Sequence, residues 1–90
     1  MKYFDWDEEK NNILKSQRSI GFEDVLIAIE GKDVIDKLNH PKRKNQQILV
    51  IKHNNYAYLV PYVEDDEKIF LKTIIPSRKA TRDYLKGGKP

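Results

Sequence analysis

The stretch IIPSRKATRDYL, residues 74–85, gathers several cations where a short helix would begin. Arg78 and Arg82 are four residues apart, so on a helix they would project from one face, with Lys79 beside them. Positive charge in a first helical turn opposes the helix dipole and costs up to ~1 kcal/mol when exposed. The stability of the helix therefore does not explain these cations. They are suited to hold an anion such as a phosphate. The alternative is that they cap carbonyl groups or pair with the acidic residues 64–67.

If such an anion is RNA, its cleavage without a metal needs a base for the 2′-hydroxyl, an acid for the 5′-oxygen and cations around the phosphorane. Positioned acids and bases contribute about 10²–10⁴-fold, and electrostatic stabilisation often contributes more. The chain has two histidines, His40 and His53, and either side chain can exchange a proton near neutral pH. Lys72 is a further candidate cation. We therefore expect His53 and Lys72 to be catalytic together with the cations above. The alternative is that each histidine is an ordinary surface or loop residue.

Aromatic side chains could hold the bases of single-stranded RNA. Tyr56, Tyr58 and Tyr62 alternate along one apolar run, and such rings stack on unpaired bases. His40 and Arg43 lie in a polar loop with the run KRK, and we assign them to the same RNA-binding set. The alternative is that the tyrosines are packed sheet residues. No acidic–histidine cluster, Gly-rich phosphate loop or nucleophile elbow occurs, so we expect neither a metal nor a cofactor.

Apolar periodicity predicts the elements that position these side chains. We expect helices over about 6–18, 22–30 and 77–86. We expect strands over about 34–38, 47–53, 56–63 and 68–75. Asp5 and Glu8 have capping-box spacing for a helix starting at Trp6, and Ser77 is a suitable N-cap for the last helix. The prediction is a single α+β domain, residues 1–90, with two N-terminal helices packed on a three- or four-stranded antiparallel sheet and a short C-terminal helix.

A two-residue Asn-Asn turn would join the central strands and pair His53 with Tyr56. This register puts the three tyrosines and His53 on one face of the sheet, and Val50 and Leu59 on the other. We expect the N-terminal helices to cover the Val50 face with the apolar stripe of residues 22–29. The tyrosine face would then stay partly exposed, bordered by cations, as is typical of a binding cleft or a docking site.

Length and charge limit the class of protein. Ninety residues without cysteine allow one small domain with no disulfide or thiolate metal site. No apolar run is long enough for a membrane span or a signal peptide, so we expect a cytoplasmic protein. Residues 39–53 hold four basic and no acidic side chains, and residues 72–90 hold six against one. Such segments suit a polyanion, although a solvated basic surface has the same composition.

Three stretches are similar to one known family, in the same order and over nearly the whole chain. They are FDWDEEK at 4–10, GFEDVL at 21–26 and TIIPSRKATRDYL at 73–85. In these stretches the chain resembles the BrnT-type ribonuclease toxins of bacterial type II toxin–antitoxin pairs. The resemblance implies a RelE-like fold and a metal-independent endoribonuclease that cuts single-stranded RNA or mRNA to arrest growth. It also implies a small antitoxin with a ribbon-helix-helix part, which would cover the active cleft and alone contact DNA.

The chain departs from this family at three positions. Arg18 stands where members often have histidine, Thr73 stands where they often have arginine, and Tyr62 with Val63 replaces a frequent histidine. Two alternatives therefore stay open. One is a catalytically decayed RelE- or ParE-like module that docks an antitoxin or nucleic acid through its basic C-terminal helix. The other is a gyrase-directed toxin of the related ParE group.

Overall fold

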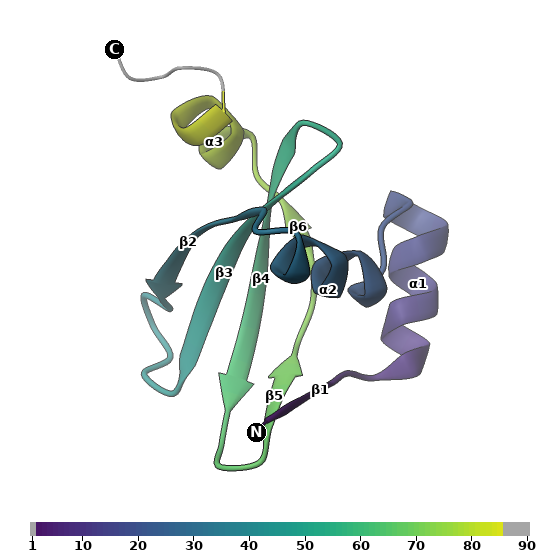
Figure 1. Ribbon diagram of the computed structural model, residues 1–90, viewed down its shortest axis with the longest axis vertical. Helices are drawn as coiled ribbons and strands as arrows, with labels where there is room; N and C mark the ends of the chain where they lie inside the picture. The colour runs from purple at the N-terminus through teal and green to yellow at the C-terminus, as the bar shows by residue number, and fades with distance from the viewer. Residues whose placement is uncertain (1, 86–90) are drawn as a thin grey trace.

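A long antiparallel hairpin forms the centre of the sheet in the computed structural model, which describes residues 2–85 (Figure 1). Its strands are β3 (Gln46–His53) and β4 (Tyr56–Glu64). Both asparagines of the two-residue turn have positive φ, 54° and 62°, which asparagine tolerates better than most residues. The observed register pairs His53 with Tyr56 and Gln47 with Tyr62, so the predicted pairing is confirmed.

The sheet is mixed and larger than predicted. Its other strands are β1 (Tyr3–Asp5), β2 (Val34–Asn39), β5 (Lys68–Leu71) and β6 (Ile75–Pro76). The order is β1-β5-β4-β3-β2, with β1 parallel to β5, and β6 pairs with β4 beside Tyr58 and Leu59. The α+β class is confirmed, but the predicted three or four antiparallel strands were too few. Strand β1 was missed, and the single strand predicted over 68–75 is divided into β5 and β6.

The N-terminal helices are α1 (Glu8–Arg18) and α2 (Phe22–Glu30). The predicted start of the first helix at Trp6 was wrong, because Asp7 is the N-cap and accepts hydrogen bonds from the amides of Glu9 and Lys10. Asp5 instead ends β1 and accepts a hydrogen bond from the Trp6 amide. In residues 2–85 no helix is both long and apolar enough to cross a membrane.

The C-terminal helix consists of α3 (Arg78–Ala80) followed by one π-helical turn, η1 (Thr81–Leu85). The Ser77 hydroxyl accepts a hydrogen bond from the Ala80 amide, so the predicted N-cap is confirmed. Residue 86, at which the predicted helix ended, lies outside the described residues.

The helices cover the opposite faces to those predicted. Helices α1 and α2 pack on the tyrosine face, where Phe22 and Val25 join Ile51, Val60 and other buried side chains in the main core. The smaller cluster on the other face contains Val50 and Ala57, and Ala80 and Leu85 of the C-terminal helix cover it. The bulky tyrosine face needs two long helices, whereas the small Ala57 side chain lets a short helix approach the sheet closely. The expected exposed tyrosine face therefore does not exist.

Candidate nucleic-acid interface

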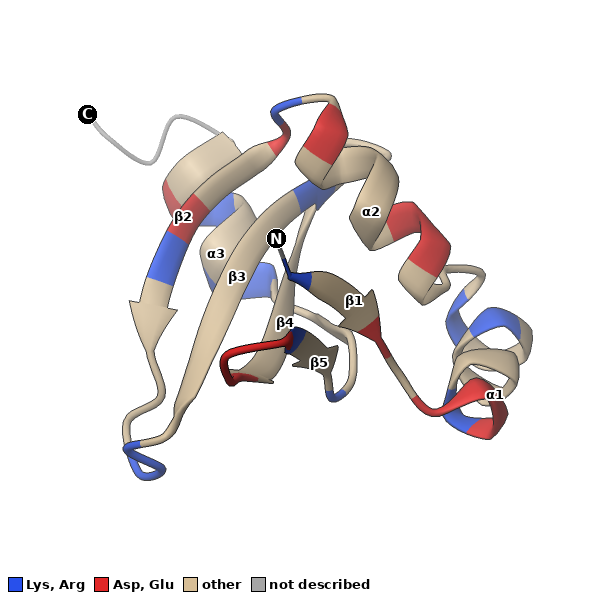
Figure 2. Ribbon diagram, turned by 60° about the horizontal axis from the view of Figure 1, so that its bottom comes forward, with Lys and Arg blue, Asp and Glu red and all other residues tan. Residues whose placement is uncertain are grey.

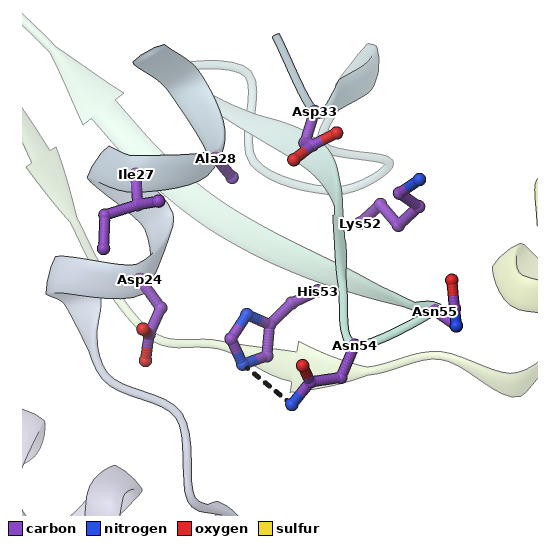
Figure 3. A pocket seen from close by; sticks show the side chains of 8 residues that line it. All are labelled: Asp24, Ile27, Ala28, Asp33, Lys52, His53, Asn54 and Asn55. Carbon is purple, nitrogen blue, oxygen red and sulfur yellow. Dashed lines mark hydrogen bonds between the residues drawn. The ribbon is translucent and has the colours of Figure 1, made fainter. Parts of the chain in front are cut away.

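Three ring side chains meet at the turn end of the β3–β4 hairpin. The half-buried His53 ring meets the Tyr58 ring edge to face, with 5.9 Å between centroids, and Tyr56 meets Tyr58 in the same way at 5.7 Å. The Asn54 side-chain nitrogen lies 3.4 Å from His53 Nε2 (Figure 3). An amide nitrogen can only donate, so this long contact favours the tautomer with an unprotonated Nε2. The His53 ring is thus oriented by Tyr58 and by the Asn54 side chain.

The start of the C-terminal helix is fixed at the same end of the hairpin, and the helix packs on the other face of the sheet. The Ser77 amide donates to the Ala57 carbonyl at 3.0 Å, and the Ala57 amide donates to the buried Thr81 hydroxyl at 2.9 Å. Arg78 follows Ser77 and Tyr56 precedes Ala57, so these hydrogen bonds hold Arg78 near the hairpin end. Within residues 2–85, Arg78 forms no ion pair, and its side chain is exposed.

The other two cations of this helix share one carboxylate. Lys79 Nζ lies 3.2 Å from Asp83 Oδ2, and Arg82 Nε lies 3.4 Å from Asp83 Oδ1. The Lys79 hydrogen bond is the largest of the influences that lower the pKa of Asp83. The Lys79 and Arg82 side chains are 78% and 64% exposed, so water weakens both pairs and an incoming phosphate can compete with Asp83. The acidic residues 64–67 are not their partners.

A hollow of about 250 Å³ lies between α2 and the hairpin turn (Figure 3). Its lining includes His53 and Lys52, but also the carboxylates of Asp24 and Asp33. Asp24 accepts a hydrogen bond of 2.9 Å from the Gly21 amide, so it serves the start of α2. Helix α2 carries three acidic residues and no basic one (Figure 2). These carboxylates repel a phosphate, so this hollow is not a suitable phosphate site.

Tyr62 cannot stack on a base in this structure. Its side chain lies in the main core and is 3% exposed, and its hydroxyl donates to Gln47 Oε1 at 2.9 Å. Burial, with the nearby charge of Glu64, raises the pKa of Tyr62. Of the three tyrosines assigned to RNA, only the half-buried Tyr56 and Tyr58 remain near the surface.

The remaining assigned residues lie elsewhere on the sheet. His40 and Arg43 occupy the β2–β3 loop, at the opposite end of β3 from His53, where His40 Nδ1 accepts hydrogen bonds of 3.1 Å from the Lys42 and Arg43 amides (Figure 1). Lys72 follows β5, and its Nζ lies 5.9 Å from the centroid of the Phe70 ring. Because Phe70 pairs with Val63, this lysine lies on the face away from the tyrosines. The structure therefore brings the His53, Tyr56 and Tyr58 rings together and separates them from these three, while Arg78 begins a helix that lies on the other face at the same end of the hairpin.

Sequence reasoning missed one contact of this region. Arg18 Nη1 donates to the Ile74 carbonyl at 2.6 Å, which ties the end of α1 to the segment entering β6. Arg18 had been noted only as a departure from the family's histidine. A cation in the last turn of a helix is a common stabilising feature, so its sequence position alone does not predict a contact 56 residues away.

Within residues 2–85, no group of three or more histidine, aspartate or glutamate side chains could hold a metal ion. Comparison with protein-family models, with curated proteins and with solved structures found no match for the chain. The likeness to BrnT-type toxins therefore depends on the three sequence stretches quoted above.

Proposed function

We propose that this protein is the toxin of a type II toxin–antitoxin pair and cleaves single-stranded RNA without a metal. The observation that supports this most directly is that His53 and the start of the C-terminal helix at Arg78 both lie at the turn end of the hairpin, where hydrogen bonds of Ala57 hold Ser77 and Thr81. The arrangement of two helices on one sheet face and a short helix on the other is also compatible with a RelE-like fold.

In the proposed reaction His53 removes the proton of the 2′-hydroxyl, and the 2′-oxygen attacks the adjacent phosphorus. The bond from phosphorus to the 5′-oxygen breaks, and that oxygen takes a proton from water, which leaves a 2′,3′-cyclic phosphate and a 5′-hydroxyl. The Arg78 guanidinium stabilises the charge that develops on the phosphorane. Arg82 and Lys79 add to the local positive potential, and Tyr56 supports a neighbouring base by stacking.

The test is cleavage of a long single-stranded RNA by the purified protein in excess EDTA. We expect the wild type to cut, the double variant Arg78→Ala with Arg82→Ala to lose activity, and His53→Ala to fall by about 10²–10⁴-fold. Arg43→Ala is the matched control, because it removes an exposed arginine at the far end of the sheet and should leave cleavage intact. Equal losses in Arg43→Ala and in the double arginine variant, or no cutting by the wild type, would refute the proposed site.

The second candidate is a binding module of the same fold without catalysis. It is favoured by the pairing of Lys79 and Arg82 with Asp83 and by an apolar area that no described helix covers. In that case RNA would stay intact with wild type and variants, while a neighbour-encoded ribbon-helix-helix protein would bind. Inhibition of gyrase supercoiling with intact RNA would instead indicate the ParE-type activity.

A further inference from the structure

The loop between β2 and β3 closes on the ring of His40. The Nδ1 atom of His40 accepts hydrogen bonds from the amides of Lys42 and Arg43, each at 3.1 Å. A backbone amide can only donate, so Nδ1 carries no proton and the neutral ring has its proton on Nε2. Two backbone hydrogen bonds of 3.1 Å complete the loop, from the His40 amide to the Gln46 carbonyl and from the Gln46 amide to the Arg43 carbonyl.

Little besides this ring holds the segment 41–45, which we call the basic loop. Its five residues are all exposed, whereas His40 is half-buried. Lys42, Arg43 and Lys44 lie together at its tip (Figure 2), and within residues 2–85 none of the three forms an ion pair. Pro41 has no amide hydrogen to donate. The first half of the basic loop therefore depends on two hydrogen bonds to a single nitrogen atom.

A second proton on the His40 ring would bind to Nδ1, the atom that holds the basic loop. Histidine side chains change charge between about pH 5 and 8. An imidazolium has only donors, so both hydrogen bonds to the loop would be lost at once. The imidazolium would also stand beside three cations, and their repulsion decreases when the loop opens. Both effects favour an open loop in the protonated state.

The charged groups of the neighbouring elements do not replace these hydrogen bonds. They are Asp36 and Lys37 of β2, Glu64 of β4, and Asp65 and Asp66 of the β4–β5 turn. Asp36 accepts a hydrogen bond from Tyr84, and Glu64 pairs with Lys2. Asp65 and Asp66 share a hollow with Lys44. No carboxylate of residues 2–85 forms an ion pair with the His40 ring, so an imidazolium has no acidic partner in place.

We propose that His40 is a proton-sensitive switch of the basic loop. Its neutral ring closes the loop, and its protonated ring releases the amides of Lys42 and Arg43 and opens the loop. The pH therefore decides whether the three cations are held in one arrangement or are free to rearrange. The inference goes beyond the proposed function, because His40 lies at the opposite end of β3 from His53 and outside the proposed catalytic set.

The experiment is NMR of the full chain from about pH 8 to about pH 5. We expect the ring nitrogen signals to show the proton of neutral His40 on Nε2. The amide signals of Lys42 and Arg43 should move together with the His40 ring signal. Exchange of both amides with water should rise by about two- to tenfold on protonation, the factor that corresponds to the loss of one hydrogen bond.

The matched variant is His40→Asn, whose side-chain oxygen can accept from the amides that follow it but does not titrate. Comparison at the same pH removes the intrinsic pH dependence of amide exchange. We expect both amides of this variant to stay protected at both ends of the pH range. In His40→Ala, which has no acceptor, they should exchange rapidly throughout. His53→Ala removes the other histidine of the chain and should leave the titration of the basic loop unchanged.

Three results would overturn this proposal. They are a neutral His40 ring with its proton on Nδ1, amide signals of Lys42 and Arg43 that do not follow the His40 titration, and amides of His40→Ala that exchange as slowly as those of the wild type at about pH 8. None of these measurements involves RNA. Their outcome is therefore independent of the cleavage test, and either proposal can fail while the other stands.

Discussion

Replacement of Thr81 by valine should destabilise the protein without changing the shape of the side chain. The Thr81 hydroxyl is buried, donates to the Ser77 carbonyl at 2.8 Å and accepts from the Ala57 amide at 2.9 Å. Valine keeps the packing but leaves the Ala57 amide, in a fully buried residue, without a partner. The Ser77 carbonyl still accepts from the Thr81 amide, so one buried group alone loses its hydrogen bond. An unpaired buried amide costs about 1–3 kcal/mol.

That cost is a large share of the free energy of unfolding, which is roughly 5–15 kcal/mol for a native protein. A loss of 2 kcal/mol would lower the melting temperature by about 8–16 °C. Urea unfolding followed by the fluorescence of Trp6, the single tryptophan, measures the change. Its ring stacks on Phe22 in the main core, 5.5 Å between centroids, so it reports on global unfolding.

The matched control for this prediction is Thr81→Ser, which keeps the hydroxyl and removes one methyl group. It should lose less than about 1 kcal/mol. The reasoning is refuted if Thr81→Val unfolds at the wild-type urea concentration, or if the serine variant loses as much as the valine variant.

Two further predictions concern the hydrogen bond between Tyr84 and Asp36 and the loop between α1 and α2 at Gly21. The Tyr84 hydroxyl donates to Asp36 at 2.7 Å, which lowers the pKa of Asp36 and raises that of Tyr84. The stabilisation by this bond should therefore be present between the ordinary pKa values of the two groups, and be lost as the pH falls through the folded-state pKa of Asp36 or rises through that of Tyr84. Urea midpoints of wild type and Tyr84→Phe should converge at both extremes, and a constant difference would contradict this. Gly21→Ala would place a Cβ 2.9 Å from the oxygen of the buried Asn11, so we expect a loss of about 1–3 kcal/mol in thermal unfolding. Ser19→Gly in the same loop should not destabilise, because Ser19 has a φ of 58°.

The local elements could be predicted because their signals lie within a few residues of each other. The β3–β4 hairpin needs only the Asn-Asn turn and the alternation on either side. Helix α2 needs only its apolar spacing and the glycine before it. Strand β1 has three residues, too few to show alternation, and its partner β5 lies more than sixty residues later in the chain. Nothing near Tyr3–Asp5 in the sequence distinguishes it from a helix start.

The choice between sheet faces could not be predicted because both faces of the hairpin are apolar. It depends on side-chain volume across distant elements, here the small Ala57 beneath the C-terminal helix. This choice decided the candidate site. It buried Tyr62, whereas Lys72 lies on the other face because of the strand register, and the local signal of the hairpin turn correctly placed His53 beside Tyr56. The site could thus be predicted where it depends on residues close together in the sequence. It could not be predicted where it depends on which helices cover which face of the sheet.

The parallel pairing of β1 with β5 has a consequence for the growing chain on the ribosome. The first thirty residues contain both long helices, but their apolar sides have nothing to pack on until the hairpin has emerged from the exit tunnel. The edge strand Tyr3–Asp5 must wait longer still, until residues 68–71 are synthesised. Contacts between such distant segments are slow to form. The turn end of the hairpin, which carries His53, likewise gains its contacts with Ser77 and Thr81 only after those residues have been synthesised.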